Sequence, residues 1–327
     1  MSFAGSHPDA EGRGAEDRGA GWPQTGGVPY ALADVFAEQP LSGNPLAIVT
    51  DARSLSSAAM QAVARETNLS ETTFILPRSP ALEAERGVQV RIFTVAEELP
   101  FAGHPTLGTA SWLHWNHPRL QGAPRITLDL PVGPIVVEFR AQEGGRPGVF
   151  ATMQQQDPVF GNCFTSTQDR ETVAALLGLQ PEAIAADLPM QIVSTGMAFC
   201  IVPLRSLAAA AQVQLRGREA ALWLRQHGAM FFYCITPAAA QSGADWHARM
   251  QFYNGEDPAT GSAAGCAIAY LVQHGAVASE CSTVIEQGIE MGRPSRIYVQ
   301  ARRTHDTVRN VRVGGRTIPV ASGRLFL

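Results

Sequence analysis

Two segments of the chain combine glycine, proline and polar side chains in a pattern that is typical of a helix start. They are Gly103-His104-Pro105 and Asp257-Pro258-Ala259-Thr260-Gly261-Ser262. The unpaired N–H groups and the dipole of a helix N-terminus favour anions, and glycine lets a ligand approach the backbone closely. Two such helix ends would form a cleft suited to a carboxylate substrate, into which His104, Asp257 and Ser262 could project.

The same side chains also have ordinary structural interpretations. Asp257 and Ser262 are favoured N-cap types, and His104 could be a histidine in a turn. Glu71 lies where a helix is expected to end, at Asn68, and a strand to begin, so its position alone predicts a solvated loop residue. Residue type and position therefore leave catalysis, capping and simple exposure open.

The helices expected after these two starts carry no charged residue, over 105–115 and over 261–273. A helix without a charged face is normally buried, so each is expected to lie inside a sheet that wraps around it. We therefore predict an α+β fold of two pseudo-symmetric lobes, 29–148 and 149–327. Each lobe would be a curled, mostly antiparallel sheet around a central buried helix.

Hydrophobic periodicity and turn residues predict the remaining elements. Further helices are expected over 56–67, 171–177 and 220–227. Strands are expected over 30–36, 46–49, 71–76, 87–94, 126–130, 134–139, 191–194, 199–203, 230–236, 249–253, 283–287 and 296–300.

Composition sets broad limits on the class of protein. The 327 residues carry a formal net charge of -4 with no basic stripe, which argues against nucleic acid as a partner. The apolar runs are too short for a membrane span. Residues 1–28 read as a disordered leader without the apolar stretch of a signal peptide. The five cysteines, with no C-x-x-C, then favour a reducing, cytoplasmic location.

The chain contains no lysine, because all 25 of its basic residues are arginine. A lysine Schiff base is therefore impossible, which excludes pyridoxal-phosphate enzymes and class I aldolases. A P-loop NTPase and a protein kinase also need a lysine. The chemistry must use carboxylates, histidine, cysteine, hydroxyls and backbone groups.

Three motifs together resemble the phenazine-biosynthesis PhzF family. They are Asn68-Leu69-Ser70-Glu71-Thr72-Thr73-Phe74, Leu99-Pro100-Phe101-Ala102-Gly103-His104-Pro105-Thr106-Leu107-Gly108 and Gly255-Glu256-Asp257-Pro258-Ala259-Thr260-Gly261-Ser262-Ala263. Shorter matching segments lie at 34–36, 43–46, 193–196, 287–288 and 292–294. The resemblance runs in order from about Tyr30 to the C-terminus.

The resemblance implies a fold like that of diaminopimelate epimerase, a homodimer, and an isomerase that uses neither metal nor organic cofactor. The type member acts on trans-2,3-dihydro-3-hydroxyanthranilate. Carried over residue by residue, the family pattern makes Glu71 the general acid/base. The polar and backbone groups that it places around a small carboxylate substrate are those of His104, Asp257, Ser262, Gly103, Gly261 and Asn44.

The expected mechanism is a proton shift, in which Glu71 removes a proton from an acidified C–H and returns it to another carbon. An epimerase or racemase that uses Glu71 with His104 or Asp257 is a second hypothesis, and a metabolite-binding protein without activity is a third. The two-cysteine mechanism of diaminopimelate epimerase is not expected, because neither helix start carries a cysteine. The chain departs from the usual family pattern at 197–199 and 251–255, which leaves the substrate open.

Overall fold

A computed structural model of the chain describes residues 26–141, 144–241, 243–252 and 255–327. The predicted leader over 1–28 therefore lies outside the described residues up to position 25, and the first strand begins at Val28. The helices are α1 (Ser57–Thr67), α2 (Pro80–Arg86), α3 (Gly103–Asn116), α4 (Thr167–Leu176), α5 (Leu207–Ala211), α6 (Gly217–His227) and α7 (Gly261–Gln273), with the 3-10 helix η1 at Pro181–Ala183.

The main sheet contains the strands of the first half of the chain and the long last strand, together with most of the other strands. They are β1 (Val28–Val35), β2 (Asn44–Val49), β3 (Thr72–Leu76), β4 (Val88–Phe93), β5 (Glu98–Leu99), β6 (Arg125–Leu130), β7 (Gly133–Phe139), β8 (Val149–Gln154) and β18 (Thr307–Leu325). The others are β9 (Val159–Phe164), β10 (Met190–Ser194), β11 (Ala198–Pro203), β12 (Phe231–Thr236), β13 (Trp246–Arg249), β14 (Gln251–Phe252), β15 (Gly255–Glu256), β16 (Thr283–Gln287) and β17 (Ser295–Thr304).

The sixteen-stranded main sheet is partly closed into a barrel. Its order runs β1-β2-β3-β4-β6-β7-β8-β18, and β18 also pairs with β1, which closes that part into a ring. Helix α3 packs on the ring strands β1, β2, β3, β6, β7, β8 and β18, and so fills the interior. From β18 the sheet continues through β17, β16, β13, β12, β11 and β10 to β9.

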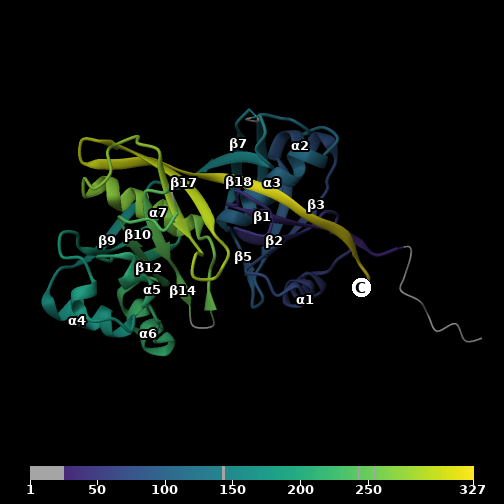
Figure 1. Cartoon of the computed structure of the whole chain (residues 1–327). Helices are drawn as coiled ribbons and strands as arrows, with labels where there is room; N and C mark the ends of the chain where they lie inside the picture. Colours follow the sequence, from purple (N-terminus) through teal and green to yellow (C-terminus); the bar gives the residue numbers. More distant parts are fainter. Residues whose placement is uncertain (1–25, 142–143, 242, 253–254) are drawn as a thin grey trace, which may run out of the picture.

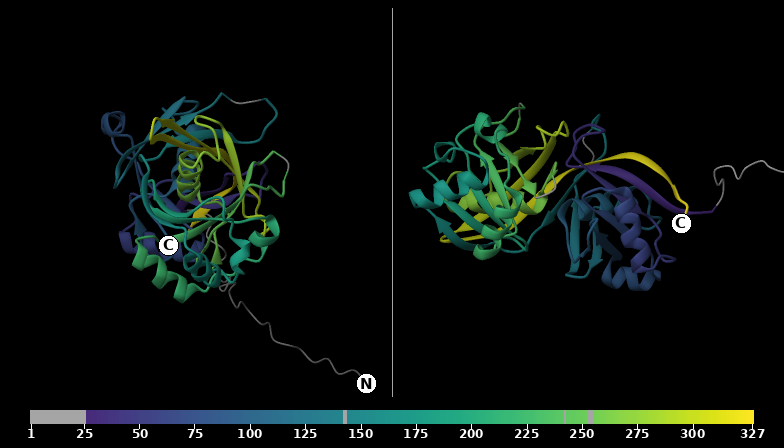
Figure 2. Two further views of the ribbon diagram at one scale, coloured as in Figure 1. Left: turned by 90° about the vertical axis from the view of Figure 1, so that its left-hand side faces the viewer. Right: turned by 90° about the horizontal axis from the view of Figure 1, so that it is seen from below.

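The second helix without charge is surrounded in a similar way. Helix α7 packs against β10, β11, β12, β17 and β18, and the left view of Figure 2 shows it, in yellow-green, inside curled strands. The yellow strand β18 runs across the molecule and belongs to both parts of the sheet (Figure 1). The prediction that both helices are buried is confirmed, because nearly every residue of α3 from Gly103 to Leu113 and of α7 is buried.

Most strand pairings are antiparallel, as predicted, but the sheet is mixed. The parallel pairings among the described strands are β2–β3, β4–β6, β11–β12 and β13–β16. Parallel neighbours need a crossover connection, and helix α1 supplies it between β2 and β3.

Local sequence explains where several helices begin and end. Ser56 caps α1 by accepting a hydrogen bond from the Ala59 N–H, and Asn68 ends it in the left-handed conformation with φ 50°. Ser166 and Asp169 form a capping box at α4. Asn68 is the helix end that the sequence predicts, and the helices over 56–67 and 220–227 are confirmed. The helix expected over 171–177 is α4, which begins earlier, at Thr167.

The strand prediction over 249–253 is wrong in its bounds. Strand β13 ends at Arg249 and a separate two-stranded sheet, β14–β15, begins at Gln251; position 253 lies outside the described residues. The elements without a counterpart among the predicted ones are α2, α5, η1, β5, β8, β9, β15 and β18.

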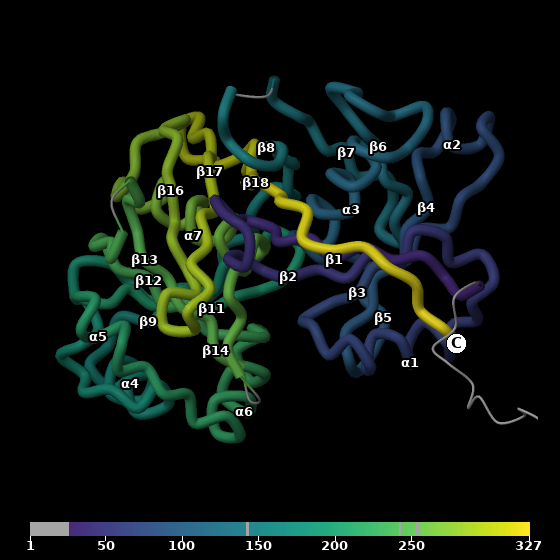
Figure 3. The backbone as a smooth tube through the Cα atoms, turned by 45° about the vertical axis from the view of Figure 1, so that its right-hand side comes forward, coloured from purple at the N-terminus to yellow at the C-terminus, as the bar shows by residue number. Residues whose placement is uncertain are grey.

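Contacts between two distant loops bring the two parts of the chain together. The Arg293 guanidinium donates to the Gly43 carbonyl at 2.8 Å and to Asp34 Oδ1 at 2.7 Å, and the Gly43 N–H donates to the Pro294 carbonyl at 3.0 Å. Figure 3 shows the purple N-terminal backbone against the yellow-green backbone at this place. Asn44, the first residue of β2, is thereby held beside the segment that precedes α7.

Among the described residues, none of the helices combines the length and apolar character that crossing a membrane requires.

Candidate active site

The N-termini of α3 and α7 meet face to face. A Cβ atom placed on Gly103 would lie 3.6 Å from the Gly261 Cα and 3.5 Å from the Ser262 nitrogen. The N-cap residues Ala102 and Thr260 form no side-chain capping bond. The positive ends of two buried helix dipoles therefore converge on one place, as the glycine pattern predicts.

Capping does not explain the polar side chains at these helix starts. The N-cap of α7 is Thr260, so Asp257 lies three residues before it and Ser262 lies inside the first turn. His104 is the second residue of α3 and is 5% exposed. The capping interpretation of Asp257 and Ser262 is therefore wrong, and so is that of His104 as a turn residue.

Glu71 lies between Asn68, which ends α1, and Thr72, which begins β3. Its side chain is only 16% exposed, so the interpretation as a solvated loop residue is wrong. Glu71 Oε2 lies 3.5 Å from His104 Nε2, and both atoms are buried with no hydrogen-bond partner among the described residues. Unpaired buried polar atoms are costly, which makes them candidates for contact with a ligand.

The protein environment shifts the pKa values of this pair in opposite directions. Burial raises the pKa of Glu71 to about 8, and the charge of Asp257 adds to the shift. Burial lowers the pKa of His104 to about 3. At neutral pH the carboxyl group of Glu71 holds a proton and the imidazole of His104 is neutral. A carboxyl whose pKa lies near neutrality is suited to both taking and giving a proton.

Asp257 is buried and accepts hydrogen bonds from three side chains. Thr260 Oγ1 donates to Oδ2 at 2.6 Å, and Asn44 Nδ2 and Ser70 Oγ donate to Oδ1 at 2.9 and 3.2 Å. Burial raises the pKa of Asp257 to about 6, against the lowering effect of these bonds. Ser70 is the neighbour of Glu71, so Asp257 is tied to the segment that carries the other carboxyl.

Asn44 has one polar atom left over. Its amide donates to Asp257 Oδ1 and to the Ala259 carbonyl, both at 2.9 Å, whereas its Oδ1 is buried and has no partner among the described residues. This oxygen can accept a hydrogen bond from an amine or hydroxyl of a ligand.

Two glutamines that hold the α7 start were missed as site residues. Gln287 donates to the Asp257 carbonyl at 2.7 Å and accepts from the Thr260 N–H at 3.1 Å. Gln155 donates to the Gly261 carbonyl at 2.9 Å. Gln287 lies in a motif of the resemblance, but nothing in the pattern around Gln155 indicates its role, since it depends on a contact 106 positions away.

Two open hollows elsewhere on the molecule are not this site. One of about 250 Å³ and one of about 270 Å³ share Gln300 and Arg312 in their linings, and neither lining includes Glu71, His104 or Asp257. The candidate site is therefore identified by its side chains and not by the size of a hollow.

His114 and Cys266 are not candidates for catalysis. His114 contacts the Ala123 carbonyl and stacks on Phe139. Burial raises the pKa of the Cys266 thiol to about 11, so the thiol stays protonated.

Known proteins resemble this chain in sequence and in fold. A sequence model described as phenazine biosynthesis-like protein matches residues 33–323. The chain is 35% identical over 301 residues to trans-2,3-dihydro-3-hydroxyanthranilate isomerase of Pseudomonas aeruginosa, covering 91% of this chain and 99% of that one. It is 34% identical over 308 residues to an uncharacterized isomerase of Mesorhizobium japonicum, covering 91% and 98%.

A solved structure is similar over nearly the same extent. The predicted epimerase from Pseudomonas aeruginosa superimposes with a TM-score of 0.77 at 34% identity, covering 92% of this chain and 99% of that one. Fold and relatives together define the class of protein, an isomerase of the PhzF type. The chain belongs to the phenazine biosynthesis-like family.

Proposed function

We propose that the protein shifts a proton between two carbons of a small carboxylic acid related to trans-2,3-dihydro-3-hydroxyanthranilate, with Glu71 as the general acid/base and no cofactor. One observation carries the proposal: Glu71 Oε2 is buried, has no hydrogen-bond partner among the described residues, and lies 3.5 Å from Nε2 of a neutral histidine. The named substrate of relatives at 35% identity supports the substrate class.

In the first step, the ionised carboxylate of Glu71 takes a proton from a C–H that is acidified by the neighbouring conjugated system. The negative charge that develops on the substrate is stabilised by the N-termini of α3 and α7, at Gly103 and Gly261. In the second step, the same carboxyl returns the proton to another carbon, so that atoms and charge balance over the cycle.

The remaining polar groups hold the substrate and set the charge of the site. Asn44 Oδ1 accepts a hydrogen bond from the substrate amine or hydroxyl, and Ser262 donates to its carboxylate. His104, neutral at working pH, hydrogen-bonds a substrate oxygen without adding charge. Asp257 keeps the pKa of Glu71 high through its own charge, so that the protonated form is available to return the proton.

The proposal includes an arrangement of two lobes, 29–148 and 149–327, with the substrate between the helix N-termini. It also includes a homodimer and a cytoplasmic location. The ring of strands around α3 and the curled strands around α7 support the lobe division.

An epimerase is a second candidate, because the site holds two buried carboxyls of raised pKa, Glu71 and Asp257. A racemase needs an acid and a base on opposite faces of one carbon. The two functions differ in outcome: epimerisation scrambles configuration at the carbon that exchanges, whereas a proton shift moves a double bond.

The test is proton exchange in deuterated water, followed by NMR, with dihydro-hydroxyanthranilate and a panel of small carboxylic acids. We expect the wild-type protein to exchange or isomerise at least one compound and Glu71→Gln to lose this activity by about a thousandfold, in line with general acid/base catalysis. Glu98→Gln, an exposed carboxylate paired with Arg91, is the control and keeps full activity. Undiminished activity of Glu71→Gln would overturn the assignment.

A further inference from the structure

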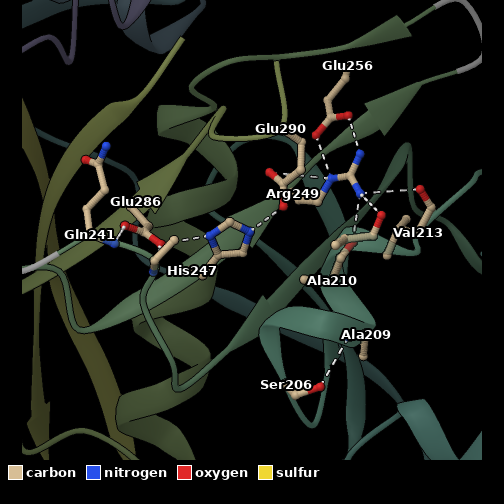
Figure 4. Close-up of polar contacts among 12 residues, drawn as sticks. Ser206, Ala209, Ala210, Val213, Gln241, His247, Arg249, Glu256, Glu286 and Glu290 are labelled. Carbon is tan, nitrogen blue, oxygen red and sulfur yellow. Dashed lines mark hydrogen bonds and ion pairs between the residues drawn. The ribbon is translucent and has the colours of Figure 1, made fainter. Parts of the chain in front are cut away.

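Behind the segment that carries Asp257 lies a network of charged side chains that the proposed mechanism does not use (Figure 4). Its exposed fractions are 1% for His247, 0% for Glu286, 6% for Arg249, 12% for Glu256 and 22% for Glu290. Buried charges cost several kcal/mol each unless they are paired, so this cluster must be held together by its internal contacts.

His247, on β13, joins two carboxylates. Its Nδ1 lies 2.9 Å from Glu286 Oε1 and its Nε2 lies 3.0 Å from Glu290 Oε1. Only the protonated imidazole can donate from both nitrogens at once. Burial lowers the pKa of His247, but the hydrogen bonds and charges of Glu290 and Glu286 outweigh this and raise it. The imidazolium of His247 therefore joins Glu286, near the end of strand β16, to Glu290 in the segment after it.

Arg249, at the end of the same strand, binds Glu256 through two parallel bonds. Its Nε donates to Oε1 at 2.8 Å and its Nη2 to Oε2 at 2.6 Å. Its Nη1 donates to the carbonyl of Ala210 at 2.7 Å, at the end of α5, and its Nε lies 3.8 Å from Glu290 Oε2. A bidentate pair fixes orientation as well as distance. The contact between Arg249 and Glu290 joins this pair to His247, because Glu290 also binds the imidazole.

Residues next to the network in the chain bind the backbone N–H and the carbonyl of Asp257. Glu256 precedes Asp257 in the chain, and the Asp257 N–H donates to the carbonyl of Met250, the neighbour of Arg249, at 3.0 Å. Glu286 precedes Gln287, whose amide donates to the Asp257 carbonyl at 2.7 Å. The peptide groups on either side of the Asp257 side chain are therefore fixed by neighbours of network residues.

We propose that Arg249, Glu256 and His247 are positioning residues, which hold the β14–β15 segment and the end of β16 so that the Asp257 carboxylate stands beside the Glu71 segment. The inference rests on the proposed function for its effect on catalysis. Among the described residues, none of these three side chains forms a hydrogen bond or an ion pair with Glu71 or His104. They act through the backbone of Asp257 and through Gln287.

The charges of the network also affect the protonation of Asp257. Glu256 is the charged group whose repulsion raises the pKa of Asp257, after burial, and its pairing with Arg249 neutralises it locally. Arg249 thus lets the Glu256 carboxylate stand next to Asp257 in the chain without forcing Asp257 to hold a proton.

The test compares two neutral amide substitutions in ion pairs of matched burial. Glu256→Gln removes the carboxylate that Arg249 binds. Asp129→Asn removes the partner of Arg78, at 2.8 Å and with 11% exposure, on the other part of the sheet. The first measurement is amide hydrogen exchange without substrate, and the second is kcat and KM on the compound that exchanges in deuterated water.

We expect Glu256→Gln to speed amide exchange at Asp257 and Thr260 and to leave the α3 amides unchanged. We expect kcat to fall about tenfold to a hundredfold, as displacement of a catalytic group by a fraction of an ångström does, while KM changes less than about threefold. Asp129→Asn changes neither quantity. Arg249→Lys, which keeps the charge but loses the fork, also speeds exchange and lowers kcat, although the network stays electrically balanced.

Unchanged amide exchange at Asp257 and Thr260 in both network variants would overturn the inference. It would also be overturned if Asp129→Asn lowered kcat as much as Glu256→Gln at the same loss of stability. The amide-exchange measurement needs no turnover, so it decides the positioning role even if no compound in the panel reacts, which would count against the proposed function alone.

Discussion

Glu71 Oε2 and His104 Nε2 lie 3.5 Å apart, and both atoms are buried without a hydrogen-bond partner among the described residues. One residue precedes β3 and the other begins α3, and each has its ordinary charge suppressed by burial. The site therefore holds a proton on the carboxyl rather than on the imidazole, which is the reverse of a solvent-exposed pair. Four predictions follow from this arrangement and from the packing around it.

Glu71 should destabilise the folded protein at neutral and alkaline pH. Its pKa is about 8 in the fold and near 4.5 when unfolded. The folded state thus binds more protons between these values, and the free energy of unfolding falls as pH rises from about 4.5 to 8. Glu71→Gln removes this loss, which is on the order of a few kcal/mol. We expect its Tm to exceed the wild-type Tm by roughly 2 °C or more at pH 8.5, and to match it at pH 4.5. A gain of equal size at both pH values would contradict a raised pKa.

The pH dependence of kcat/KM should report the ionisation of Glu71 and its coupling to Asp257. The base form accumulates as pH rises, so kcat/KM should climb to a plateau above about pH 8. Asp257→Asn removes the charge that raises the Glu71 pKa, and the midpoint should fall by about one pH unit. His104, with a pKa of about 3, adds no limb between pH 5 and 7. Stopped-flow or NMR initial rates from pH 5 to 9.5 give these profiles, and an unmoved midpoint in the variant would show that the two carboxyls are not coupled.

Gly265→Ala should loosen the start of α7. A Cβ atom at this position would lie 1.8 Å from Gln155 Oε1, so Gln155 must leave its bonds to the Gly261 carbonyl and to Thr195. Overpacking and a lost buried hydrogen bond together cost about 1–3 kcal/mol. Chemical denaturation measures the loss.

The matched variant is Gly144→Ala, where a Cβ would meet nothing within 4 Å. It should change the free energy of unfolding by less than about 0.5 kcal/mol. Equal effects of the two substitutions would mean that Gln155 is free to move without cost.

Gly103→Ala should affect substrate binding more than folding. The added Cβ would stand 3.3 Å from Met153 Cε, a flexible end, and 3.6 Å from the Gly261 Cα. It therefore occupies the space where the two helix N-termini meet without displacing backbone. We expect a loss of stability below about 1 kcal/mol and a rise in KM of about tenfold or more. Titration with the reacting carboxylic acid checks this, and a KM like that of the wild type would place the ligand elsewhere.

Features that depend on local chemistry can be predicted from the order of the residues alone. The absence of lysine, the absence of charge in α3 and α7, and the Gly- and Pro-marked helix starts together predict two buried helices and a carboxylate- and histidine-based site. The helix ends at Asn68 and Gly228 follow from single residues that adopt the left-handed conformation. These signals act over a few positions, so they can be read along the chain.

Features that depend on distant partners become visible only in the folded chain. Strand β18 was missed because Asn310, with φ 53°, interrupts the alternation of Val308, Val311 and Val313. Its role in closing the ring depends on pairing with β1 and β8. Glu71 lies beside His104. Its neighbour Ser70 binds Asp257, which is 187 positions further along the chain. The pKa of a carboxyl is set by the water and charges around it, and a sequence does not contain that neighbourhood until the chain has folded.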